Sequence, residues 1–401
     1  MAENRRHQSR EEEGVGTKGI KEKSMSSPLP HQPYGFSRRD FLKAVVVGSS
    51  GLLAACMPQV NETPTALPIA ATPAPVEPAV SIVKIKSGNI GAAVEEAIQL
   101  LGGIEAVTSG KERIMLKPNL VSSVAWTTTN PEVIRSLVTL MKKAGKVVSI
   151  GEGTAGVENI NQFGSKAFRL KDPDKLNSMQ QLVFDRLGYT ELARSLDVPL
   201  INLHTGAMVD VEVPGGLAYQ RVTIHRALTE IDLLCSVPMM KTHGLATVTL
   251  GMKNLIGLYP GSVYRTVRAG VHDHAADAGS QGIAFEILDM VRANKLGLVV
   301  IDGSTAMEGD GPVNGNLVPM DIIIAGTNPL ATDMVAANVM GFEPSEVPTF
   351  VWAHKIGMQP QSLDEIEIRG EKVANVRRNF ARPQVTPWNT IRSIWGNEEM
   401  D

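Results

Sequence analysis

Short apolar runs alternate along this chain with longer stretches in which apolar residues recur at helical spacing. The runs typical of strands are 81–86, 113–117, 146–150, 198–203, 231–237, 298–301, 321–325 and 365–369. Helical periodicity occupies 90–101, the segment after Asn130, 165–197, 282–293, 328–340 and 347–356. Strands that alternate with helices form parallel sheets with crossover helices. We therefore predict an α/β fold with a mainly parallel sheet, in two lobes with a cleft between them.

Two local signals refine this prediction. Asn130 is a plausible helix N-cap, with Pro131 at the first helical position and Gly145 past the end. Residues 209–213 and 217–224 flank a Pro-Gly-Gly turn and predict an antiparallel hairpin inserted into the α/β chain.

The N-terminal part predicts export. Residues 1–36 are polar, without apolar periodicity, and are expected to be disordered. Residues 37–43, SRRDFLK, resemble a twin-arginine signal, and the apolar run 44–55 is too short to span a bilayer. Cys56 ends LAAC, which resembles a lipobox, so residues 37–56 predict lipidation at Cys56 and anchoring on the outer face of the cytoplasmic membrane.

Composition divides the rest into a Pro/Ala/Thr-rich tether at 57–80, an α/β domain at 81–370 and a C-terminal tail at 371–401. Without residues 1–55 the chain keeps 30 Lys and Arg against 36 Asp and Glu, a formal charge of −6. This balance disfavours nucleic-acid binding. Only Cys235 remains once Cys56 is lipidated, so the chain's own cysteines build no iron–sulfur cluster. Cys235 lies in an apolar run and is expected to be a buried, inert thiol.

Most candidate chemistry follows the apolar run 231–237. Ligands of open α/β sheets bind at the carboxyl ends of strands, so the polar stretch 237–274 is a candidate site. We assign proton transfer to His243, binding of anionic groups to Lys241 and Lys253, and orientation by hydrogen bonds to Asn254. Partly buried lysines suit anion binding or covalent chemistry.

Other polar residues stand at the expected ends of strands. The candidate substrate-binding residues are Lys117, Asn119, Glu152, Asp302, Glu308, Asp310 and Asp333. Glu152 lies in G-x-G-x-x-G at 151–156, but no good helix former follows, which favours a glycine turn over a dinucleotide loop. The acidic loop expected at 302–315 suits a divalent cation or acid/base work, and equally a solvated turn. Together these groups predict a cleft for a small anionic ligand, or alternatively structural salt bridges.

The histidines divide into two classes. We expect His204 and His225 to be satisfied core side chains. His272 and His274 flank Asp273, and an extended H-x-H points both rings to one face, so this pair is the candidate site for a divalent metal.

Five motifs, at 117–121, 151–153, 237–261, 302–315 and 325–342, resemble the DUF362 family over essentially the whole globular part. Some relatives have a ferredoxin-like module whose cysteines this chain lacks. The resemblance implies more about fold and site than about the reaction.

The chain also resembles, more distantly, the nickel-pincer lactate racemase family. The resemblance rests on the order of a few residues along the chain: His243, Lys253, Gly257, Pro260-Gly261 and a later His272 or His274. That resemblance implies that Lys253 holds the pincer nucleotide, that His243 is a base, and that His272 or His274 binds nickel. The chain departs from the family pattern: Gly251-Met252 replaces the double glycine before the lysine, and the second catalytic histidine has no counterpart.

The sequence therefore predicts an exported, membrane-anchored DUF362-type enzyme. We expect acid/base or metal-assisted chemistry on a small anionic substrate, isomerase- or racemase-like or redox-associated. The alternative is a non-catalytic ligand- or metal-binding lipoprotein that serves a membrane or redox partner.

Overall fold

The computed structural model describes residues 77–156 and 170–384. The expected disordered region, export signal, Cys56 and most of the tether lie outside the described residues, as does the segment directly after the G-x-G-x-x-G turn. The described residues belong to one compact unit. Where the sequence analysis expects a cleft between two lobes, this unit is built on a single main sheet, and its cavity lies at strand ends of that sheet.

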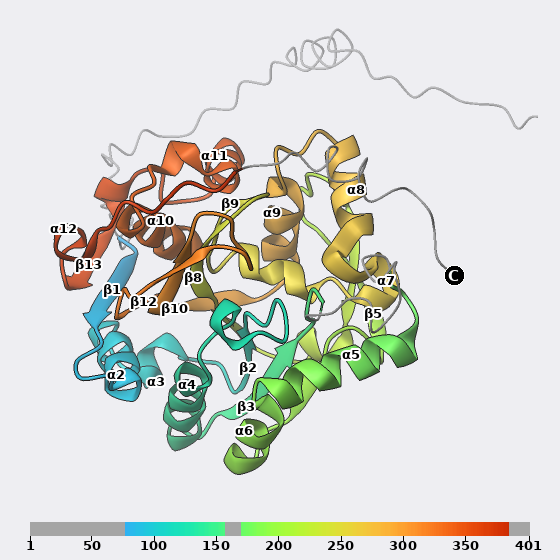
Figure 1. Ribbon diagram of the computed structural model, residues 1–401, viewed down its shortest axis with the longest axis horizontal. Helices are drawn as coiled ribbons and strands as arrows, with labels where there is room; N and C mark the ends of the chain where they lie inside the picture. Colours follow the sequence, from blue (N-terminus) through green and yellow to red (C-terminus); the bar gives the residue numbers. More distant parts are fainter. Residues whose placement is uncertain (1–76, 157–169, 385–401) are drawn as a thin grey trace, which may run out of the picture. The chain divides into compact units, whose positions relative to one another are not determined.

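The main sheet has the strand order β13-β1-β12-β10-β7-β2-β3-β4 (Figure 1). Strands β10, β7, β2, β3 and β4 are mutually parallel, and β12 runs antiparallel to both of its neighbours. The predicted mainly parallel sheet is therefore confirmed. The strands of this sheet are β1 (Ala79–Lys84), β2 (Arg113–Pro118), β3 (Val147–Glu152), β4 (Leu200–Asn202), β7 (Leu233–Val237), β8 (Met239–His243), β9 (Thr247–Thr249), β10 (Leu296–Glu308), β11 (Asn316–Val318), β12 (Ile322–Gly326) and β13 (Glu367–Gly370).

The central strands are apolar on both faces because helices cover both faces. In β2, Ile114 and Leu116 belong to one core cluster and Met115 to the other. The first cluster is completed by α2 (Ile90–Leu100), α3 (Ile104–Val107), α4 (Pro131–Lys143), α5 (Pro173–Arg186) and α6 (Tyr189–Leu196). The second is completed by η5 (Lys253–Leu258), α9 (Ala284–Ala293), α10 (Pro329–Val339) and α11 (Pro348–Lys355). Figure 1 shows the two groups of helices on opposite sides of the sheet.

Local signals in the sequence account for several boundaries. The Asn130 side chain accepts the backbone N–H of Glu132 at the start of α4, and Asn328 caps α10 in the same way. The predicted hairpin is also confirmed as β5 (Met208–Glu212) and β6 (Arg221–His225), an antiparallel pair separate from the main sheet. Asp289 of α9 accepts three backbone N–H groups, at residues 217–219, in the chain that leads into β6.

The loop expected at 302–315 is wrong for residues 302–308. Residues 302–308 continue β10 as a strand, because β8 lies beside them and supplies pairing partners: Asp302 is opposite Met239, and Met307 is opposite Lys241. The spacing of apolar residues within 302–308 holds no information about this partner strand, which comes from another part of the chain. Beyond Gly370 the chain still packs on the domain, through α12 (Val373–Val376) and the buried Phe380.

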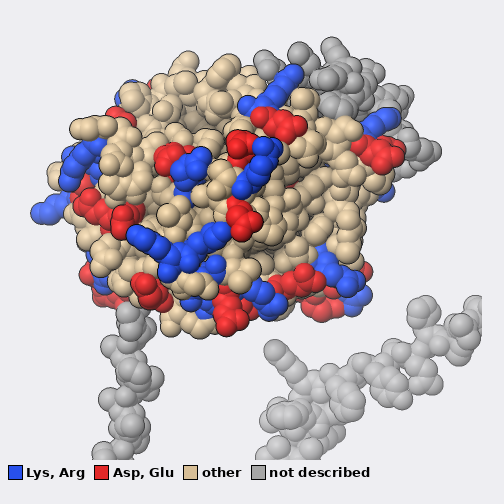
Figure 2. All heavy atoms as spheres, turned by 90° about the horizontal axis from the view of Figure 1, so that it is seen from below, with Lys and Arg blue, Asp and Glu red and all other residues tan. Residues whose placement is uncertain are grey.

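The face drawn in Figure 2 carries Lys and Arg intermixed with Asp and Glu, so this face presents no extended patch of one charge. Within the described part of the chain, no helix is both long enough and apolar enough to cross a membrane.

Asp333 of α10 fixes the start of the segment that carries Lys253. Its carboxyl oxygens accept the backbone N–H groups of Gly251 and Met252 at 2.7 and 2.8 Å. We expect Asp333→Ala to lower the free energy of unfolding by about 2–5 kcal/mol, because it leaves two buried N–H groups without an acceptor. Denaturant titration measures this loss. Asp333→Asn keeps one acceptor oxygen and should lose less; equal stability of wild type and Asp333→Ala would contradict the assignment.

Candidate functional site

A cavity of about 710 Å³ opens at the carboxyl ends of β2, β3 and β8. Strands β2 and β7 are neighbours, but their connections leave in opposite directions: β2 continues to β3 on one side, and β7 leads by way of η5 and α9 to β10 on the other. Such a topological switch point is where open α/β sheets bind ligands. The location expected from the sequence is therefore where the cavity lies.

Three of the predicted residues form one buried network in the cavity wall. The Lys117 amine donates to Glu152 Oε1 at 2.7 Å, to Asn254 Oδ1 at 3.1 Å and to the Pro118 carbonyl at 3.0 Å. Asn254 Nδ2 donates back to the Lys117 carbonyl and to Ser236 Oγ of β7. The network ties η5 to β2, β3 and β7, so Lys117 and Asn254 act first as anchors of the cavity wall.

Both carboxylate oxygens of Glu152 also accept hydrogen bonds from the backbone. Its Oε1 also accepts the Gly153 N–H at 2.8 Å, and its Oε2 accepts the Leu120 N–H at 2.9 Å. Lys117 and Glu152 are 1% and 2% exposed. Burial lowers the pKa of Lys117, and the Glu152 carboxylate opposes that shift. The turn expected to present Glu152 therefore does so toward the cavity wall and not toward solvent.

Arg268 adds a second buried cation, and no carboxylate within 77–156 or 170–384 contacts it. Its guanidinium donates to the carbonyls of Gly153, Thr154, Ile256 and Gly257, so it joins the end of β3 to η5. Burial lowers the pKa of Arg268 to about 10, which still leaves it charged at neutral pH. Arg265, Val267 and Arg268 all have positive φ, a run of strained backbone of the kind found at functional sites.

In contrast to Lys117 and Arg268, the Lys253 amine is available to bind a ligand. It opens η5 and lines the cavity, and its Nζ makes no hydrogen bond or ion pair among residues 77–156 and 170–384. Burial, and then the positive charges of Lys117 and Arg268, lower its pKa to about 7. The side chain is half-buried in the cavity wall.

His243 also lines the cavity, at the end of β8. Its Nδ1 accepts the Leu245 backbone N–H at 3.0 Å. Burial, followed by the charge of Lys253, lowers its pKa well below the usual value, so the ring is neutral. A neutral ring that accepts at Nδ1 carries its proton on Nε2. His243 therefore offers an N–H donor, which suits hydrogen bonding to an anionic oxygen better than removal of a proton.

The paired orientation expected for His272 and His274 is wrong. Both lie on α8 (Ala269–Asp277), and residues two apart on a helix point about 200° apart. His272 faces the cavity, and its ring contacts Glu286 Oε1 at 2.9 Å and is hydrogen-bonded to the backbone of Val267. Burial lowers the pKa of His272 and raises that of Glu286, so this pair is uncharged. His274 points away and contacts the Ala218 carbonyl.

The remaining predicted carboxylates do not line the cavity. Asp302 accepts the Asn130 backbone N–H and the Ser304 hydroxyl. Glu308 and Asp310 accept backbone N–H groups of Ala381 and Gln384. Asp333 holds the segment before Lys253, as described above. Each of these groups satisfies the backbone of a neighbouring element, which sequence position alone does not reveal.

Lys241 also lies behind the cavity wall, fully buried, and its amine donates to the Thr127 carbonyl at 2.6 Å. Asn119 does line the cavity and donates to Asn254 Oδ1. Two expected structural residues are confirmed: His204 bonds the Thr154 carbonyl and the Gly261 N–H in the core, and burial raises the pKa of the Cys235 thiol.

Within the described ranges, no group of three or more His, Cys, Asp or Glu side chains could hold a metal ion. Of the residues that the racemase outline implies, His243, Lys253 and His272 line the cavity together, whereas His274 points away. The His272 ring is committed to Glu286 and to the Val267 backbone. We therefore derive no step through a metal or a pincer nucleotide.

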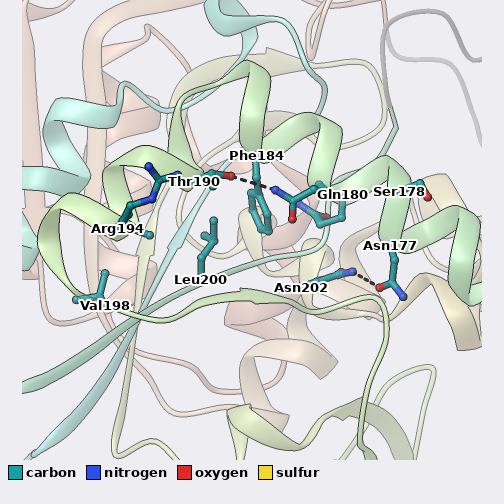
Figure 3. A pocket seen from close by; sticks show the side chains of 11 residues that line it. Asn177, Ser178, Gln180, Phe184, Thr190, Arg194, Val198, Leu200 and Asn202 are labelled. Atoms are coloured by element: carbon teal, nitrogen blue, oxygen red, sulfur yellow. Dashed lines mark hydrogen bonds between the residues drawn. The ribbon is translucent and has the colours of Figure 1, made fainter.

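A second hollow of about 730 Å³ lies between α5, α6 and β4 (Figure 3). Its walls carry mainly amides and hydroxyls that bond one another, as Asn202 does with Asn177 and Thr190 does with Gln181. Its one charged side chain is Arg194, which pairs with Glu191. This hollow offers less chemistry than the cavity at the strand ends.

The sequence matches the family described as "Domain of unknown function (DUF362)" over residues 114–338, more than half of the chain. The chain belongs to the DUF362 family. The matched range contains Lys117, Glu152, His243, Lys253 and Arg268 of the cavity. This DUF362 chain is also 25% identical over 283 residues to the "thylakoid-associated protein sll1697" of Synechocystis sp., covering 70% of this chain and 78% of that protein.

Two solved structures are similar. The lactate racemase apoprotein from Thermoanaerobacterium thermosaccharolyticum matches with a TM-score of 0.39 and 16% identity, over 65% of this chain and 57% of that one. A structural-genomics protein from Thermotoga maritima matches with a TM-score of 0.33 and 12% identity, over 60% and 56%. The DUF362 chain thus spans less than two thirds of the length of either solved chain.

Sequence reasoning did not select Arg268 or Trp126, which both line the cavity. Arg268 lies in the polar stretch 237–274, but its burial depends on a left-handed backbone conformation. The spacing of residues in the sequence does not predict that conformation. Trp126 stands between a strand end and a helix cap, and its isolation in a polar segment is a weak signal.

Glu152→Gln removes the one carboxylate beside the buried cations. Because one partner of a buried ion pair is then left uncompensated, we expect the free energy of unfolding to fall by about 3–5 kcal/mol. Glu308→Gln is the matched control, since Glu308 accepts one backbone N–H, and it should cost about 1 kcal/mol or less. Equal losses in the two variants, measured by denaturant titration, would show that the ion pair does not organise the cavity.

Proposed function

We propose that this DUF362 protein is an exported, membrane-anchored enzyme that binds an organic anion in the cavity and moves a proton by acid/base chemistry. The observation that carries the proposal is the Lys253 amine, which lines the cavity, has no hydrogen-bond or ion-pair partner among the described residues, and has a pKa of about 7. A base is most effective when its pKa lies near the working pH.

The charges around the amine favour an anionic substrate. Lys117 and Arg268 carry positive charge, and Glu152 is the one carboxylate among the described residues that line the cavity with them. Their own donors are largely committed to protein acceptors, so they act on a ligand mainly through their field. Lys253 and the Nε2–H of His243 supply the direct contacts. Such preoriented donors stabilise negative charge that develops on a carboxylate or carbonyl oxygen.

In the proposed reaction, neutral Lys253 removes a proton from the carbon next to the carboxylate or carbonyl group. The resulting ammonium pairs with the substrate anion, which favours the transfer, and His243 donates a hydrogen bond to the anionic oxygen. Return of the proton completes an isomerisation or a racemisation. Arg265, Val267 and Arg268, with their strained backbone, hold one wall of the cavity in place during this exchange.

Proton transfer by Lys253 is tested by deuterium uptake in D2O, at C2 of 2-hydroxy carboxylates and at C3 of 2-oxo carboxylates, followed by NMR. The rate should rise with pH through about 7 as the amine loses its proton. Lys253→Arg keeps the charge but cannot accept a proton, so we expect at least about 100-fold slower uptake. Uptake at the wild-type rate in Lys253→Arg would refute the mechanism. Binding without any uptake would instead favour the non-catalytic binding lipoprotein.

Binding of the same carboxylates has its own pH dependence. Protonated Lys253 attracts an anion and neutral Lys253 does not, so affinity should fall as pH rises through about 7. Calorimetry should show this fall in the wild type and a flat profile in Lys253→Arg, whose charge persists. The same slope in both proteins would mean that another group titrates.

The proposed anchor rests on the twin-arginine and lipobox motifs at 37–56. We expect Cys56→Ala to move the protein from the membrane fraction to the soluble fraction and to abolish the added lipid mass. Cys235→Ala is the matched control, because the chain has two cysteines and Cys235 is buried in the core. Membrane retention and unchanged mass in Cys56→Ala, measured by fractionation and intact mass spectrometry, would contradict lipidation.

A further inference from the structure

The cavity is large for the anionic group alone. Its volume of about 710 Å³ falls within the range of roughly 300–1,000 Å³ that encloses drug-sized ligands. A carboxylate held by Lys253 and His243 would occupy the charged end and leave most of this volume unfilled. The remainder must be explained by the rest of the ligand.

Charge and exposure change along the cavity. The ion pair of Lys117 and Glu152 lies at its deep end, at 1% and 2% exposure. The cavity walls are otherwise mostly apolar and include Leu120, Val124, Leu245, Ile256 and Ile283. Binding a hydrocarbon group against such walls removes apolar surface from water.

The mouth of the cavity is apolar as well. Trp126 and Val313 both line the cavity, and they are 60% and 38% exposed. They come from separate segments, η1 (Ala125–Thr127) and the loop between β10 and β11. In the described part of the chain, four large hydrophobic side chains are this exposed, and these two stand at the same opening. An exposed Trp at a cavity mouth provides a broad apolar surface for a ligand that extends outward.

We propose that the substrate is an amphiphilic organic anion, with its carboxylate at Lys253 and His243 and a hydrocarbon tail that runs along the apolar walls to Trp126 and Val313. This inference rests on the proposed function and narrows its substrate class. It explains why one cavity combines a buried cationic end with an apolar mouth.

Calorimetric titration of the full-length protein with butanoate, hexanoate, octanoate and decanoate, each below its micellar concentration, tests the proposal. Affinity should rise up to about fourfold for each added methylene that is buried. Trp126→Ala should weaken decanoate at least tenfold and leave butanoate unchanged. Val147→Ala is the matched control, because Val147 is 65% exposed at the start of β3, away from the cavity, and it should change neither affinity.

The failures of the two proposals are distinguishable. Butanoate and decanoate binding equally, both weakened by Lys253→Met, would overturn the amphiphile and leave the proposed function standing. Equal effects of Trp126→Ala and Val147→Ala would also overturn it. If no carboxylate binds at any length, or if Lys253→Met changes no affinity, the anion site itself is refuted. Decanol provides the last control, because a neutral head group should bind at least tenfold more weakly than decanoate.

Discussion

The whole candidate site depends on one buried carboxylate, Glu152, placed among several cations. Glu152 holds the Lys117 amine at 2.7 Å and accepts two backbone N–H groups, so it fixes the ends of β2 and β3 against η5. It also offsets part of the repulsion that Lys117 and Arg268 exert on Lys253. Among the residues that the structure describes, Glu152 faces two committed cations, Lys117 and Arg268. Their excess positive charge attracts an anion and keeps the Lys253 amine easily deprotonated.

Close backbone approach makes this arrangement possible. A Cβ on Gly257 would lie 2.6 Å from Glu152 Oε1 and 2.7 Å from Lys117 Nζ, and a Cβ on Gly153 would lie 2.7 Å from the Gly257 carbonyl. Both positions therefore require glycine for space. The guanidinium of Arg268 then binds the carbonyls of these two glycines, which clamps the turn after β3 to η5. Gly153 of the G-x-G-x-x-G turn thus serves packing against a charged network.

The fold could be predicted from the sequence because local patterns predict its elements. Apolar runs mark the strands, and Asn130 and Asn328 mark the starts of helices. The sequence also indicates that Lys117, Glu152 and His243 lie close together, because each stands at the carboxyl end of a strand and these ends meet at one edge of the sheet. Lys253 and Asn254 reach the same cavity by another route, through η5, which follows the antiparallel strand β9. Prediction from the sequence fails where side-chain direction depends on distant partners. Asp302 and Asp333 satisfy backbone groups of other elements, His272 and His274 diverge because their segment is helical, and Arg268 is buried by a left-handed backbone.

The central claim is that the Lys253 amine is neutral near physiological pH in a cationic cavity. NMR titration of the full-length protein labelled with 13C at lysine Cε measures this directly, with the Lys253 signal assigned from its loss in Lys253→Arg. The account predicts a midpoint at about pH 7. A midpoint near the ordinary lysine value of about 10.4 would mean that the amine stays charged, and it would contradict the proposed base.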